Sequence, residues 1–214
     1  MASASITTRY DAAKKKTHVA GTLAFDNSDI NLTATVADTS TLLSGGFNLN
    51  SIALEKPGSF GINFDIPDQD VRFQFMNSFK VLKKPVDLSY AHSRAYNRTA
   101  LGGRVELDLS NTVSGKYDFG SGHSKIKYRY SHNGLTTVEP GYNFDRKGWQ
   151  LAASHKFSGG DVVKASYKSD RKILGVDFVK NTADGNFKVS ASLDLAEKLT
   201  FPTVNAQSTW NFNM

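Results

Sequence analysis

The sequence lacks cysteine altogether and has only two tryptophans and five prolines among its 214 residues. Without cysteine, disulfide bonds, thiolate nucleophiles and cysteine-ligated zinc are excluded. It also contains no run of about 18 apolar residues, which a membrane-spanning helix requires, so it does not encode a helical membrane protein. A membrane β-barrel stays open, because the strands of such a barrel are apolar on one face only.

The charge balance is basic, with 26 Lys and Arg against 20 Asp and Glu and a formal net charge of +6. Such a balance favours acidic partners: nucleic acid, anionic lipid or anionic solutes. The N-terminus, Met1-Ala2-Ser3-Ala4-Ser5, lacks a basic start followed by an apolar stretch, so we expect neither a secretory signal nor a cleaved transit peptide. No shift in composition marks a boundary, and we expect one domain over residues 1–214.

Apolar and polar side chains alternate along nearly the whole chain. Residues 125–130 carry cations at odd positions and apolar side chains at even positions, and residues 104–109 and 187–195 show the same period of two. Turn residues such as Asn, Asp and Gly separate these runs. The pattern predicts an all-β meander of about 14 antiparallel strands, within a range of 12–16.

Two stretches break the alternation. Residues 47–54 change face midway, which indicates a β-bulge or a misplaced strand boundary. Residues 135–144 contain Pro140 and Gly141, which we expect to kink or end a strand.

Three architectures fit such a chain: a soluble sandwich or small barrel, a nucleic-acid-binding barrel, and a transmembrane up-and-down barrel with apolar side chains facing lipid. The apolar face of the best strands is almost free of charge, as the lipid face of a barrel would be. Aromatic residues recur near predicted strand ends, as in an interfacial girdle: Tyr10, Phe25, Tyr90, Phe119, Tyr130, Phe157, Phe178 and Phe212. About fourteen strands also favour an open interior.

The polar face carries an excess of cations and would line the pore of a membrane barrel. The predicted pore-lining residues are Arg72, Arg104, Glu106, Asp108, Lys116, Asp118, Lys125, Lys127, Arg129, Lys156, Lys164, Lys168, Lys188 and Asp194. The cluster Lys125, Lys127 and Arg129 would concentrate anionic solutes; the alternative is a solvated strand face without a role in selectivity.

The sequence offers no convincing catalytic or metal site. The five histidines are scattered without metal-ligand spacing. Glu106 and Asp108 share a strand face, as a pair of acid–base carboxylates would, but they fit better as lumen residues paired with Arg104 or with a cation of a neighbouring strand. We therefore expect no enzyme activity and no cofactor. Basic residues interleaved with aromatic ones also fit single-stranded nucleic acid, but in a membrane barrel the rings face lipid, so we expect no nucleic-acid partner.

Five stretches resemble the 24 kDa outer envelope pore proteins of plant chloroplasts: residues 55–60 (EKPGSF), 65–67 (DIP), 72–77 (RFQFMN), 134–140 (GLTTVEP) and 209–214 (TWNFNM). The resemblance covers essentially the whole chain. It implies a β-barrel solute channel, porin-like and of broad specificity, in the outer envelope membrane of the plastid. It implies passage of triose phosphates, sugars, dicarboxylates, phosphate, nucleotides and charged amino acids.

The expected partners are membrane lipids, small anionic and zwitterionic metabolites and inorganic ions, and a homo-oligomer is compatible with the sequence. The family is described as weakly or mildly cation-selective, whereas a basic wall attracts anions. Either some of the assigned lysines lie in loops, or local acids dominate the narrowest part. The remaining alternative is a soluble β-sandwich or a lipid-binding module at the envelope surface.

Overall fold

A computed structural model describes residues 2–27, 29–37, 48–196 and 201–213. The strands are β1 (Ala2–Asp11), β2 (Lys16–Asn27), β3 (Ile30–Ala37), β4 (Asn48–Lys56), β5 (Phe60–Asp65), β6 (Asp70–Val81), β7 (Lys84–Ser93), β8 (Arg98–Glu106), β9 (Asn111–Asp118), β10 (Ser124–His132), β11 (Thr136–Asn143), β12 (Gly148–Lys156), β13 (Val162–Lys168), β14 (Ile173–Thr182), β15 (Gly185–Asp194) and β16 (Thr203–Asn213). The described residues include no helix long and apolar enough to cross a membrane.

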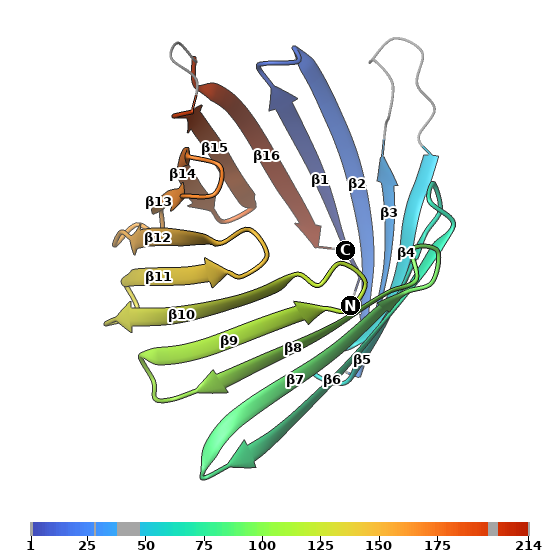
Figure 1. Cartoon of the computed structure of the whole chain (residues 1–214). Coiled ribbons are helices and arrows are strands. Elements are labelled where there is room, and N and C mark those ends of the chain that lie inside the picture. Colours follow the sequence, from blue (N-terminus) through green and yellow to red (C-terminus); the bar gives the residue numbers. More distant parts are fainter. Residues whose placement is uncertain (1, 28, 38–47, 197–200, 214) are drawn as a thin grey trace.

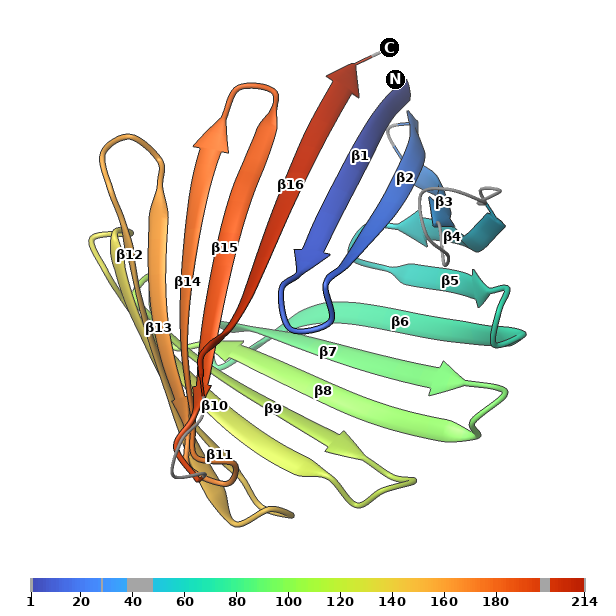
Figure 2. The ribbon, with the colours of Figure 1, turned by 90° about the horizontal axis from the view of Figure 1, so that it is seen from above.

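The sixteen strands form one closed antiparallel barrel in which each strand pairs with its neighbours in sequence (Figure 1). The ring closes where β1 pairs with β16, for example Ile6 with Trp210 (Figure 2). The all-β up-and-down barrel predicted from the alternation is confirmed, and its strand number lies at the upper end of the predicted range. A two-sheet sandwich is excluded, because closure leaves no free sheet edges.

The barrel has two different rims. We call the one where Ala2 and Asn213 lie the terminal rim; it also carries the connections that follow even-numbered strands. The opposite rim, the loop rim, carries the connections that follow odd-numbered strands, including the two longest, β3–β4 and β15–β16. Unequal connections of this kind are typical of membrane barrels.

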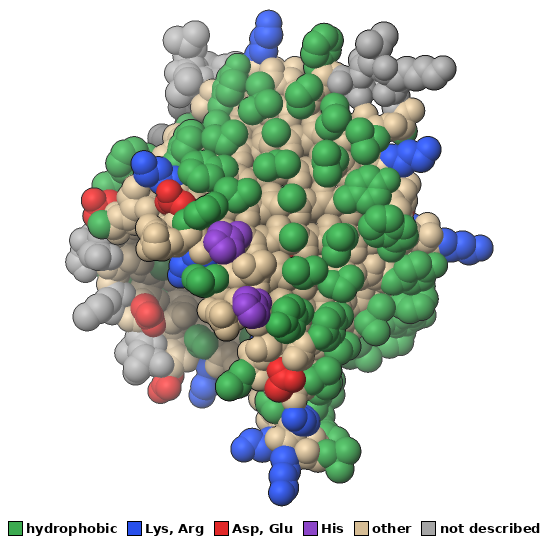
Figure 3. Space-filling model, turned by 90° about the vertical axis from the view of Figure 1, so that its left-hand side faces the viewer, with side chains coloured by type: hydrophobic (Ala, Val, Ile, Leu, Met, Phe, Trp, Pro, Cys, Tyr) green, Lys and Arg blue, Asp and Glu red, His purple; other side chains and the backbone are tan. Residues whose placement is uncertain are grey.

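The barrel has no conventional hydrophobic core. Among the described residues no hydrophobic side chain is buried, whereas many large ones face outward, with Trp210 56% and Phe119 55% exposed. Figure 3 shows hydrophobic side chains spread over one outer face, with most charged groups near its margins. A soluble protein rarely exposes so large an apolar surface, whereas a bilayer would cover it.

Some aromatic residues lie near strand ends, as the girdle prediction expects, whereas others such as Phe75 and Tyr128 lie in the middle of their strands. Near the loop rim, Tyr117 and Phe119 form an edge-to-face pair with ring centroids 4.9 Å apart, and Tyr142 and Phe144 form another at 5.1 Å. The prediction is wrong for Phe178, which lies in the middle of β14.

The two irregular stretches turn out differently. In β4 the register against β3 shifts between Thr35, opposite Ser51, and Val36, opposite Leu49, so the predicted bulge is confirmed; Phe47 lies outside the described residues. Pro140 does not end its strand, because β11 continues through it and pairs with Leu151 of β12. The strand pairing between β11 and β10 is instead interrupted between Gly141 and Val138, where proline has no N–H to donate.

Candidate functional site: the inner wall

The cross-strand register places the polar side chains together on the inner face of the barrel. Lys116 of β9 lies opposite Lys125 of β10, and Ser114 lies opposite Lys127. Residues between them in sequence, such as Ile126, belong to the outward face and are exposed. The alternation is therefore converted by closure into an apolar outside and a polar inside.

Thirteen of the fourteen predicted pore-lining residues lie within strands on this polar face. They are Arg72, Arg104, Glu106, Lys116, Asp118, Lys125, Lys127, Arg129, Lys156, Lys164, Lys168, Lys188 and Asp194. None of the cations in this set lies in a loop, so lysines in loops do not reconcile the basic wall with a cation-selective family. That these residues line a conducting pore stays a prediction.

The prediction that Asp108 lies on the polar face of a strand is wrong. Residues 104–109 predicted a strand, but β8 ends at Glu106 and Asp108 lies in the turn before β9. Its carboxylate accepts hydrogen bonds from the Ser110 and Asn111 N–H groups, both at 2.8 Å, and from the Asn111 side chain. These bonds lower the pKa of Asp108, the bond from the Asn111 side chain most of all. A short acidic side chain that bonds the backbone this way competes with strand pairing, so β8 ends at Glu106 although the alternation in the sequence continues to Leu109.

Several wall cations are paired. Lys127 Nζ lies 3.4 Å from Glu139 Oε1 and Arg129 Nε lies 4.0 Å from the same oxygen. Arg104 Nη2 contacts Glu106 Oε1 at 2.7 Å, as expected for Glu106. Glu139 was not among the predicted pore-lining residues, because the neighbouring Pro140 suggested that the strand ends there.

Further around the wall, Lys188 Nζ lies 3.4 Å from Asp177 Oδ1. The opposite part of the inner face is richer in hydroxyl and amide groups; Thr7 and Thr209, for example, lie 3.1 Å apart by their hydroxyl oxygens. The inner face is therefore asymmetric, with its cations gathered on β8–β13.

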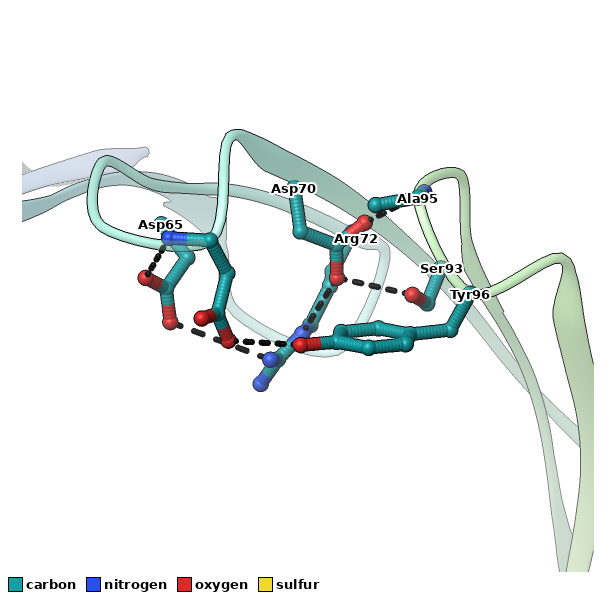
Figure 4. A network of polar contacts seen from close by, with 7 residues as sticks. Asp65, Asp70, Arg72, Ser93, Ala95 and Tyr96 are labelled. Carbon is teal, nitrogen blue, oxygen red and sulfur yellow. Dashed lines mark hydrogen bonds and ion pairs between the residues drawn. The ribbon is translucent and has the colours of Figure 1, made fainter.

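A second polar cluster stands at the loop rim and was not foreseen (Figure 4). Asp70, at the start of β6, is fully buried, and accepts hydrogen bonds from Arg72 Nε at 2.9 Å, Ser93 Oγ at 2.7 Å and the Ala95 N–H at 2.8 Å. Arg72 Nη2 also lies 3.8 Å from Asp65. Asp70 thus ties the β5–β6 hairpin to the β7–β8 loop.

The neighbouring loop residue Tyr96 adds a link to the same hairpin. Its hydroxyl donates a hydrogen bond of 2.9 Å to Asp68 Oδ2. This bond and the carboxylate charge hold the pKa of Tyr96 above its usual value, because both oppose formation of a phenolate.

Replacing Asp70 by asparagine is expected to loosen the β7–β8 loop. The substitution removes the charge that Arg72 contacts and sets an amide N–H₂ against other donors. Cleavage by trypsin after Arg94, within this loop, should become faster. Asp68→Asn is the matched control, because it disturbs the bond to Tyr96 and leaves the Ala95 N–H bonded. Equal cleavage of both variants would show that Asp70 does not hold the loop.

Comparisons with known proteins agree with this architecture. Residues 1–213 match the family model described as outer envelope pore protein 24. The chain is 42% identical over 211 residues to outer envelope pore protein 24B, chloroplastic, of Arabidopsis thaliana, covering 99% of this chain and 98% of that protein. It is 37% identical to outer envelope pore protein 24, chloroplastic, of Oryza sativa subsp. indica, covering 99% of both. The chain belongs to the outer envelope pore protein 24 family.

Solved structures add the fold. A mutant of the Rh. blastica porin superposes with a TM-score of 0.67 at 9% identity, covering 99% of this chain and 98% of that one. At this identity the likeness concerns the barrel alone. Together with the family, it makes the chain a porin-like channel protein of the chloroplast outer envelope, confirming the family and location that the sequence implied.

Within the part of the chain that the structure describes, no group of three or more His, Asp or Glu could hold a metal ion.

Proposed function

We propose that the barrel is a passive, broad-specificity pore for small charged metabolites, such as triose phosphates, dicarboxylates, phosphate, nucleotides and amino acids. One observation carries the proposal: a closed barrel of sixteen strands has a polar inner face with an excess of cations. Barrels of about 16–18 strands leave an aqueous channel, whereas about 8 strands are filled by their own side chains. Solutes would therefore diffuse through without a cofactor or a covalent step.

The cationic side of the wall supports a preference for anions. Lys125, Lys127 and Arg129 follow one another along the inner face of β10, with Glu139 as the nearby acid. One carboxylate shared between Lys127 and Arg129 cannot neutralise all three cations. Because fixed charges on a wall attract counter-ions, anions would be enriched near this side of the pore.

Reconstitution tests the proposal directly. Purified, folded protein in a planar bilayer should give discrete conductance steps that grow with salt concentration, because water and ions fill the lumen. Carbonate extraction of proteoliposomes is the control: an integral barrel stays in the membrane, whereas a surface-bound lipid-binding module is released. Retained protein without conductance would overturn the pore, and released protein would favour the surface module.

A further inference from the structure

Four lysines converge on the inner wall toward the loop rim. Lys116 and Lys125 are direct cross-strand partners on β9 and β10, and Lys127 follows Lys125 on the same face. Lys168, at the end of β13, lines the same hollow of the wall as Lys125 and Lys127. We call Lys116, Lys125, Lys127 and Lys168 the lysine patch.

The patch is poorly neutralised by the protein. Lys127 pairs with Glu139, but in the described part of the chain no carboxylate oxygen lies within 4.0 Å of the ammonium groups of Lys116, Lys125 or Lys168. Like charges directly opposite each other on neighbouring strands destabilise a sheet. The protein thus retains an unfavourable arrangement, which an anion bound from solution would relieve.

Acids at the nearby loop rim have other partners. Asp118 accepts hydrogen bonds from the N–H groups of Gly120 and Ser121, each at 3.0 Å. Asp145 lies 2.5 Å from His123 Nδ1, and Arg146 bridges Asp145 and Asp170 at 3.8 and 3.5 Å. These carboxylates hold their own loops together rather than the lysine patch.

The wall around the patch is hollowed and supplies neutral polar groups. Two hollows, of about 440 and 340 Å³, share Lys125 and Lys127. Ser89 and Ser114 line the larger hollow, and Gln150 and Ser166 line the smaller one. The carboxylates that also line them are Asp87, Glu139 and Asp177, which contact Ser78, Lys127 and Lys188 respectively.

Gly102 lines the larger hollow and has no side chain to fill it. A Cβ at this position would lie only 2.4 Å from Ser89 Oγ. Ammonium groups beside hydroxyl and amide donors, with room above them, are the chemistry that recognises phosphate oxygens.

We infer that the lysine patch is a saturable binding site for a compact polyanion bearing phosphate groups. A ligand with two or more negative charges contacts two lysines at once, whereas chloride contacts one, so the site would discriminate by valence. The inference rests on the proposed pore, since anions reach the patch through the lumen. It adds a defined resting position on the wall to a passive diffusion path.

Inorganic pyrophosphate is a suitable probe, titrated calorimetrically into the full-length folded barrel in detergent at constant ionic strength. We expect one saturable site whose dissociation constant rises about tenfold or more in Lys125→Gln, because a charge-assisted contact is lost. Lys168→Gln, on another strand, should weaken binding in the same direction. Lys156→Gln is the matched control: it removes the same charge from the same face, but at the terminal rim.

Equal weakening in all three variants would overturn the site, because it would reflect the overall charge of the lumen. Absence of saturable binding in a barrel that conducts would overturn the site and leave the pore standing. Saturable binding that depends on Lys125 in a reconstituted barrel without conductance would support the site and overturn the pore. Chloride at matched ionic strength should produce no saturable heat, and a comparable chloride signal would contradict discrimination by valence.

Discussion

Replacing Lys125, Lys127 and Arg129 together by glutamate is expected to turn the proposed anion preference of the barrel into a preference for cations. Each substitution lowers the charge by two, so the triple variant brings the formal net charge of the chain from +6 to zero. All three changes fall on the inward face of one strand, β10, next to Glu139. The local potential should therefore change sign rather than merely weaken.

The measurement is the reversal potential in a potassium chloride gradient across a planar bilayer. The shift should be large at low salt and small near 1 M, because the screening length falls from about 10 Å at 0.1 M to about 3 Å at 1 M. A variant with glutamine at the three positions should lie between the wild type and the glutamate variant.

A control with the same change in net charge separates wall charges from total charge. Lys14, Lys83 and Lys147 lie in three different turns, and their joint replacement by glutamate should shift the reversal potential much less. An unchanged reversal potential in the β10 variant, or an equal shift in the turn variant, would remove these three residues from the ion path.

Replacing Val176 by arginine is expected to destabilise the barrel in a lipid bilayer by about 2–4 kcal/mol, the cost of a cation on the lipid face near the midplane. Val176 lies within β14 on the outward face and is 44% exposed. Its cross-strand partners are the small residues Ala165 and Ala191, so the larger side chain meets little steric hindrance. The loss would therefore report transfer of charge into hydrocarbon rather than overpacking.

Urea unfolding in phospholipid vesicles, followed by tryptophan fluorescence, measures this loss. Ser190→Arg is the matched control, because Ser190 lies opposite Asp177 on the inward face, where the new charge meets water and an acid. Its effect should be far smaller. Equal losses, or a larger loss for Ser190→Arg, would show that the apolar side of the strands does not face lipid.

The strand pattern was predictable wherever alternation is clean, as in β10 and β15. It was harder to read in β4, where one extra residue reverses the faces, and in β11, where Pro140 suggested an end to the strand. Periodicity is a local signal, and a bulge or a proline perturbs it locally. A closed ladder tolerates both, because the neighbouring pairs of β11 with β12 and of β4 with β5 continue.

The sequence predicted which side chains lie on the polar face of each strand, but not which of them form ion pairs. Alternation predicted that Lys125 and Lys127 share a side, yet nothing in it indicated that Lys127 forms an ion pair with Glu139. The cluster around Asp70 was missed because Ser93 and Ala95 are more than twenty residues away in sequence and are brought to it only by the β6–β7 pairing.

The amino-acid sequence alone determined that this protein is built from strands with one apolar side and one polar, basic side. Successive side chains of a strand point to opposite faces, so alternation in the sequence is enough to create the two sides. Tertiary structure decided that sixteen such strands close into a ring, that the basic strands stand together on one part of the wall, and which acids reach which lysines. The physical reason is that register and closure depend on pairing between strands, and a side chain's electrostatic partners come mostly from the strand beside it.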